Sequence, residues 1–340
     1  MNRFISSIVF TLTVFSLYQF IDINLFTIDL PRRVSSEVFK SLRNDPGVEM
    51  EIVLLDIGYV HLDTVKNYIE VLETFEPKAI GVNLCNIEDK SELLDNYLNQ
   101  SKKIITCDCE SNSTNGTSRI TTPRNVVTHF KADRDSYFEL QLSDKENRLK
   151  ERRNDVERIN FRGVDRYFNA PLSEIEKIDP GNIKDKIVLI GFLRDSLVTP
   201  MNPWYGRPGD LQGDMSDAQI SANIISTINR GEFITEVSLM FRILIILAAC
   251  LLCIGLIRLV RTKYNVLNIL LALVILVAFS GLSSYIIVYA FSKNYYLELN
   301  EMTVVLIISS IVSVYWNTKD RQGTISQQNA HAIVGDQSNS

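Results

Sequence analysis

Apolar residues are concentrated in four runs, one near the start of the chain and three near its end, with a long, mostly polar block between them. The runs are Phe4–Phe20, Leu239–Ile257, Val266–Phe291 and Met302–Trp316. A helix of about 18 or more apolar residues can cross a hydrocarbon core of roughly 30 Å. The last run is short enough to be a buried helix, although Leu297 and Leu299 could extend it. The pattern predicts about four transmembrane helices, one N-terminal and three C-terminal.

This layout divides the chain into four parts. We expect a membrane anchor over residues 1–26, a folded domain over 27–236, three transmembrane helices over 237–316 and a disordered cytoplasmic tail over 317–340. The first run also resembles a cleaved signal peptide, since Arg3 precedes its apolar core, but no small-x-small cleavage pattern follows, which favours an anchor. The predicted tail leaves no room for an enzyme.

Basic residues in the short connections predict the orientation in the membrane. The connection between the second and third runs contains Arg258, Arg261 and Lys263, whereas the next connection contains Lys293 alone. This contrast predicts a multi-pass membrane protein with residues 27–236 on the extracytoplasmic side. Basic residues close after the first run argue for the opposite orientation: Arg32, Arg33 and Lys40. We base the orientation on the two connections between the three C-terminal runs, because both are short and their contrast in basic residues is clear.

Strand-like and helix-like segments alternate through the polar block. Short apolar runs at 51–57, 79–84, 103–107 and 186–191 are typical of buried strands, and helical spacing appears at 62–75 and 90–100. Such alternation predicts an α/β domain with a mainly parallel sheet flanked by helices. Residues 121–153 are charged and weakly periodic, and we assign them no element. A final helix over Asp217–Asn229 ends near Gly231, about seven residues before the second apolar run, so the domain should be joined almost rigidly to the membrane.

Composition excludes several classes of function. The net charge is −5 with a pI near 5.4, and no cluster of Lys and Arg suggests nucleic-acid binding. No glycine-rich phosphate loop is present. The three histidines, His61, His129 and His331, lie far apart in the sequence. None of them stands at metal-ligand spacing from another His or from a Cys. We therefore expect no metal, no cofactor and no catalytic site, and do not expect an enzyme.

Four polar residues at or after strand ends are the candidate ligand-binding residues. Asp56, Asn83 and Asp195 follow the apolar strands, and Thr199 lies in the loop beyond Asp195. In open α/β sheets, ligands bind in the crevice at the carboxyl ends of the strands. The alternative for Asp56 is a purely structural role as a helix N-cap or turn residue, which we favour by about two to one.

The cysteines give one further prediction. Cys85 ends one predicted strand, while Cys107 and Cys109 end the next, so in an oxidising compartment Cys85 could bond to one of them. Adjacent parallel strands rarely provide disulfide geometry, so we give this bond odds of about one in five. Cys250 and Cys253 lie within the second apolar run and are simplest as packing or lipid-facing residues.

The chain also resembles a known family. The segments that carry the resemblance are IVLLDI, KAIGVNL, ERINFRG, IKDKIVLIGFLRDSLVTP and DAQISANIISTINRGEFI, followed by three apolar runs. In this order they resemble the cyclase and histidine-kinase associated extracellular sensory domain, type 2 (type-2 CHASE), over roughly residues 27–316. The resemblance implies an extracytoplasmic, periplasmic sensor domain in a multi-pass protein of the bacterial inner (cytoplasmic) membrane. Because the family's output module is missing here, we expect a separate signalling partner in the cytoplasm or the membrane. The resemblance also implies an acidic residue where Asn83 stands and a His-Ala pair where Ser221 and Ala222 stand, so those contacts are altered here.

We therefore expect a membrane sensor whose external domain recognises a small molecule or a partner protein and passes a shift to the spans. The alternative is a non-catalytic scaffold or subunit that binds partner proteins without a small ligand. A membrane-tethered enzyme ranks last because it has no candidate site.

Overall fold

The computed structural model describes residues 47–84, 91–101, 103–107, 116–121, 126–133, 136–143, 149, 151–152, 154–163, 166–193, 202–203, 215–259 and 264–297. The chain divides into two compact units, Asn44–Thr235 and a second unit made of the two terminal parts.

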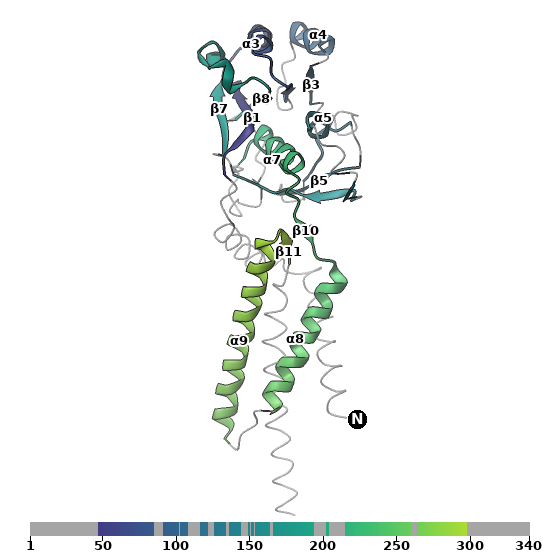
Figure 1. The fold of residues 1–340 in the computed structure, drawn as a ribbon, viewed down its shortest axis with the longest axis vertical. Helices are drawn as coiled ribbons and strands as arrows, with labels where there is room; N and C mark the ends of the chain where they lie inside the picture. The colour runs from purple at the N-terminus through teal and green to yellow at the C-terminus, as the bar shows by residue number, and fades with distance from the viewer. Residues whose placement is uncertain are drawn as a thin grey trace, which may run out of the picture. The chain divides into compact units, whose positions relative to one another are not determined.

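A five-stranded parallel sheet forms the larger half of the first unit (Figure 1). Its strand order is β3-β2-β8-β1-β7. The strands are β1 (Glu49–Asp56), β2 (Ala79–Val82), β3 (Ile104–Thr106), β7 (Tyr167–Pro171) and β8 (Ile187–Gly191). The central strand β8 is buried throughout and pairs in parallel with both β1 and β2. The predicted parallel sheet is thus confirmed, with the apolar run at 186–191 at its centre.

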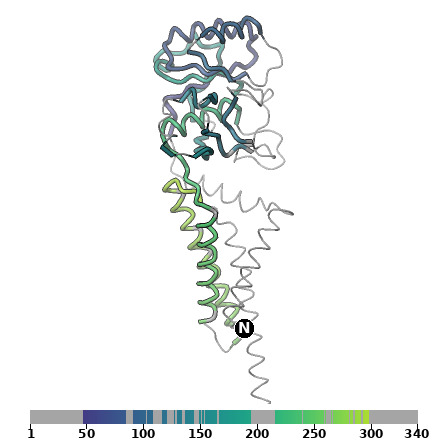
Figure 2. Tube along the Cα trace, turned by 90° about the vertical axis from the view of Figure 1, so that its right-hand side faces the viewer, coloured from purple at the N-terminus to yellow at the C-terminus, as the bar shows by residue number. Residues whose placement is uncertain are grey.

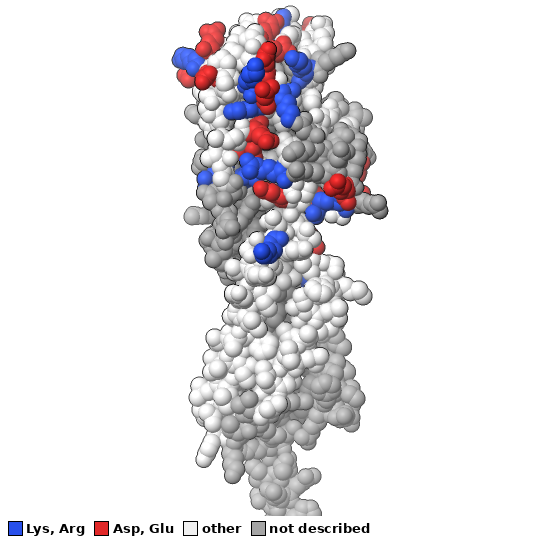
Figure 3. All heavy atoms as spheres, viewed as in Figure 1, with Lys and Arg blue, Asp and Glu red and all other residues white. Residues whose placement is uncertain are grey.

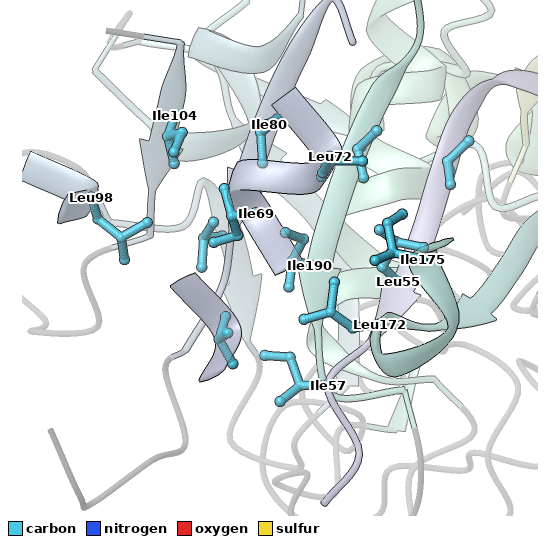
Figure 4. Packing of buried hydrophobic residues seen from close by; sticks show 14 of the residues in the cluster. Leu55, Ile57, Ile69, Leu72, Ile80, Leu98, Ile104, Leu172, Ile175 and Ile190 are labelled. Atoms are coloured by element: carbon cyan, nitrogen blue, oxygen red, sulfur yellow. The ribbon is translucent and has the colours of Figure 1, made fainter. Parts of the chain in front are cut away.

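Helices cover one face of this sheet. α3 (Leu62–Thr74), α4 (Glu92–Gln100) and the 3-10 helix η2 (Leu172–Lys177) pack on it, and a short 3-10 turn, η3 (Pro180–Asn182), precedes β8. Ile69 and Leu72 of α3 lie over Ile80 and Ile190 of the strands (Figure 4). Each such fully buried side chain contributes about 1.5–3 kcal/mol of apolar transfer free energy.

α7 (Asp217–Arg230) and α5 (Phe138–Leu142) cover the other face. α7 begins with a capping box, in which Ser216 and Gln219 exchange hydrogen bonds, and ends at Gly231 in the left-handed conformation (φ 65°). Both ends of this helix are therefore specified locally; the sequence pattern predicted the end at Gly231 but not the capping box.

A second, mainly antiparallel sheet lies on the far side of α7. It contains β4 (Arg119–Thr121), β5 (Val126–Lys131) and β6 (Val156–Arg158), and β9 (Asn202–Pro203) pairs in parallel with β5. Ile220, Ile224 and Ile228 of α7 pack with Val127 and Phe130 of β5. Figure 1 shows α7 between β5 and the strands β1 and β8. Of this second sheet, β5 and the last residue of β4 lie in the stretch 121–153, to which the sequence pattern assigned no element.

The described part of the second unit contains two long apolar helices. α8 (Leu239–Leu259) and α9 (Asn265–Ser292) lie side by side in both views (Figure 2) and include two candidate membrane spans, Met240–Ile257 and Val266–Ala290. The face seen in Figure 3 shows charged side chains of both signs on the first unit and few on α8 and α9. β10 (Thr235–Glu236) and β11 (Tyr295–Tyr296) form a two-stranded sheet.

Two of the four predicted spans thus correspond to helices of sufficient length and apolarity. The N-terminal run, the run Met302–Trp316 and the tail lie outside the described residues, so those predictions remain untested. Cys250 and Cys253 are fully buried between α8 and α9, which fits the packing role and not the lipid-facing one.

Candidate functional site

The carboxyl edge of the parallel sheet is where the sequence placed a ligand site. Asp56 ends β1 opposite Gly191 of β8, and the backbone N–H of Asn83, just after β2, donates to the carbonyl of Ile190 in β8. Asp56 and Asn83 therefore flank the same central strand, about two strand spacings, or roughly 10 Å, apart. Asp195 and Thr199, the other two candidates, lie outside the residues that the structure describes.

Asp56 has a structural role in this edge. Its Oδ1 accepts hydrogen bonds from the backbone N–H of Gly58 (3.2 Å) and of Leu193 (3.1 Å), and the residue is 9% exposed. The carboxylate thus ties the turn after β1 to the chain leaving β8. The prediction of a turn residue is confirmed, but the alternative of an N-cap is wrong, because His61 caps α3 with its side chain.

The start of α7 reaches the same edge. A Cβ built on Gly191 would lie 3.1 Å from the Cβ of Ala218 and 3.3 Å from the carbonyl oxygen of Asn83. Glycine at the end of β8 therefore lets the first turn of α7 approach the sheet closely. The first turn of α7 thus packs against the end of β8, next to the residue that follows β2.

Polar side chains hold the first half of α7. Arg119 of β4 forms a two-pronged ion pair with Asp217, at 2.8 Å and 3.0 Å. Ser221 donates to Glu139 of α5 (2.8 Å), and the same carboxylate accepts from the backbone N–H of Ser118 (2.8 Å). Every residue from Asp217 to Asn229 is buried, and buried polar groups need such partners.

At the other end of α7 lies the Glu49 cluster, which we define as Glu49, Arg162, Arg230 and Glu232. Arg230 donates to both carboxylate oxygens of Glu49 (2.9 and 3.3 Å), and Arg162 Nε lies 3.5 Å from Glu49 Oε2. Arg162 also donates to Glu232 (2.5 Å). The side chains of Glu49 and Arg162 are 1% and 2% exposed, while Arg230 and Glu232 reach the surface. The four formal charges cancel.

The environment keeps Glu49 ionised. Burial acts to raise the pKa of its carboxyl group, but hydrogen bonds from Arg230, Ser226 and the backbone N–H of Glu51 outweigh burial, so the pKa is lowered from 4.5. Burial and the negative charge of Glu49 raise the pKa of the nearby Tyr167 hydroxyl, so this phenol stays neutral. The cluster is therefore a fixed ion-pair assembly near neutral pH.

The sequence pattern did not point to this cluster. Glu49 lies two residues before the apolar run of β1, and Arg162 lies in an irregular segment after β6. One signal was present: the segment ERINFRG and the final helix were both among the motifs that carried the family resemblance. Nothing in periodicity says that they meet, because their contacts span more than sixty positions of sequence.

The described residues bear on the metal prediction but not on the disulfide prediction. Among the residues whose side chains can be described, no group of three His, Cys, Asp or Glu could hold a metal ion. Cys107 is buried at the end of β3, but Cys85 and Cys109 lie outside the described residues, so the disulfide stays a prediction.

The fold and these contacts define an α/β domain whose last helix is buried between two sheets and continues into apolar helices. Residues 59–257, more than half of the chain, match the CHASE2 domain family. The chain belongs to this family of extracytoplasmic sensory domains, as the resemblance predicted. A search of curated proteins and of solved structures finds no match.

Proposed function

We propose that this protein is a bacterial membrane sensor in which α7 carries a change at the carboxyl edge of the parallel sheet toward the membrane spans. One observation supports the proposal: α7 is buried along its length, approaches the carboxyl edge of the parallel sheet at its start, and is followed after residues 231–238 by the apolar helix α8. Membership of a sensory family supports it.

The proposed mechanism follows from packing. A ligand that draws the ends of β1 and β2 together would change the space beside Gly191, where Ala218 has little room to yield. Because a helix bonded along its whole length moves as a rigid body, the shift would reach Arg230 and the connection to α8. A separate signalling partner would receive it through the spans.

The test is ligand-dependent stabilisation of the full chain in lipid nanodiscs. Each compound of a small-metabolite library is added at about 100 times a micromolar dissociation constant, where binding to the folded state alone contributes about 2.7 kcal/mol. A sensor should show a raised melting temperature with one chemical class. If no compound shifts the melting point while cross-linking in membranes recovers a stoichiometric protein partner, the scaffold alternative replaces the sensor.

The proposed topology has its own test. In a variant without native cysteines, Tyr59→Cys places a thiol at a side chain that is 97% exposed, and Tyr264→Cys places one before α9 at 72% exposure. We expect a membrane-impermeant maleimide to label Cys at 59 in cells with a permeable outer membrane, and Cys at 264 only after the inner membrane is opened. The reverse result would invert the orientation.

A further inference from the structure

The segment between α7 and α8 is bonded to the first unit. The backbone carbonyl of Glu232 accepts from Asn160 Nδ2 (2.7 Å), and its carboxylate accepts from Arg162 (2.5 Å). The guanidinium of Arg152 lies 4.8 Å from the centre of the Phe233 ring. Phe233 and Ile234 are only 7% and 4% exposed. A free linker would leave such apolar side chains in water, so residues 232–235 behave as part of the domain.

Arg162 joins this segment to the rest of the domain. Its backbone N–H donates to Asn223 Oδ1 (2.7 Å), and its Nε donates to Ser226 Oγ (2.7 Å), so it grips α7 twice. The same guanidinium lies 3.5 Å from Glu49 of β1 and donates to Glu232 of the connecting segment. One buried side chain therefore contacts the sheet, the helix and the connection at once.

We infer that Arg162 is the positioning residue that locks residues 231–235 to β1 and α7, so that the domain's exit toward α8 moves with the sheet and not as a hinge at Gly231. This inference deepens the proposed coupling role and rests on it. The physical reason is the buried charge of Arg162, whose side chain is 2% exposed. If Glu49 or Glu232 moved away, the guanidinium would keep one of these two carboxylates to balance its charge, which is costly in a buried site. A glycine in the left-handed conformation would otherwise be a natural pivot.

Hydrogen–deuterium exchange of the full chain in nanodiscs, without any ligand, tests the lock. Arg162→Lys keeps the charge but replaces a planar fork with one ammonium group, which cannot serve Glu49, Ser226 and Glu232 together. We expect amides of residues 231–235 to exchange about tenfold faster or more, as for loss of hydrogen bonds to charged groups, while β2 and α3 keep their protection.

Arg119→Lys is the matched control, because Arg119 pairs with Asp217 at the opposite end of α7 with similar burial. It should loosen the start of α7 and leave residues 231–235 protected. Equal exchange profiles for Arg162→Lys and Arg119→Lys would overturn the inference, since Arg162 would then act only through overall stability.

A second variant covers the case in which Arg162→Lys does not fold. Glu232→Ala removes the side-chain acceptor of Arg162 at a position that is 40% exposed and leaves the contacts between Glu49, Arg162 and Arg230 in place. Faster exchange confined to 231–235 supports the lock, and unchanged exchange refutes it. Because no ligand is added, this outcome is independent of whether the metabolite screen finds one.

Discussion

Replacing Glu49 by Gln tests whether the charge of the Glu49 cluster stabilises the fold. The substitution preserves shape and an oxygen acceptor for Ser226 but removes the buried negative charge, so Glu232 is the remaining carboxylate of the cluster beside Arg162 and Arg230. Removing one partner of a fully buried ion pair costs about 3–5 kcal/mol. Arg230 is one-third exposed, so water can solvate part of the freed charge, and we expect a loss of about 2–3 kcal/mol.

The measurement is thermal unfolding of the full chain in nanodiscs, followed by circular dichroism across a range of pH. For a domain of this size, such a loss lowers the melting temperature by about 5–10 °C at pH 7. The folded-state pKa of Glu49 is lowered, so the carboxylate contributes stability above pH 4.5, and this contribution is lost as pH falls through the lowered pKa. The difference between the wild type and Glu49→Gln should therefore shrink in acid.

Glu51→Gln is the control, since Glu51 is an exposed residue two positions along the same strand. It should change the free energy of unfolding by no more than about 0.5 kcal/mol, as is typical of surface positions. A gap between wild type and Glu49→Gln that stays constant down to pH 3, or equal effects of the two substitutions, would show that the cluster's charge does not stabilise the domain.

Substitutions at two further positions, each with a control, test the packing and the candidate site. Gly81→Ala puts a Cβ 2.6–2.9 Å from Leu142, Leu189 and Phe138, so it should lower the free energy of unfolding by about 1–3 kcal/mol in chemical denaturation. Its control is Gly181→Ala, where the nearest atom would be 3.4 Å from the new Cβ, and it should be near neutral. Asp56→Ala leaves two N–H groups without their acceptor and should cost about 1–3 kcal/mol, while Asp56→Asn keeps Oδ1. If Asp56→Asn retains stability but abolishes a metabolite-induced melting shift, Asp56 contacts the ligand; if the shift survives, its role is structural.

Much of the fold follows from local pattern. The apolar runs that became β1, β2, β3 and β8 are short and continuous because both faces of a parallel sheet are buried. α7 was predicted within one residue, since its apolar spacing and the glycine after it are local signals. β7 was missed: Tyr167–Pro171 is an edge strand with exposed Phe168, so it has no continuous apolar run.

The candidate site was predicted only in part. The sequence pattern placed Asp56 and Asn83 at strand ends. It did not predict that β8 lies between their two strands, because strand order depends on crossovers between distant segments. It also gave no sign that the Asp56 carboxylate would be engaged by the backbone of Leu193, 137 positions away.

The sequence by itself determined the alternation of strands and helices in the parallel sheet, the end of α7 at Gly231 and the apolar helices α8 and α9. Each of these depends on neighbouring residues and on the spacing of apolar positions. Only the tertiary structure decided that a second sheet covers the far face of α7, and that Glu49, Arg162 and Arg230 meet. A charged residue carries the same sequence signal whether it is solvated or buried. What separates the two cases is a partner of opposite charge brought from a distant segment by packing, as Arg162 and Arg230 are brought to Glu49.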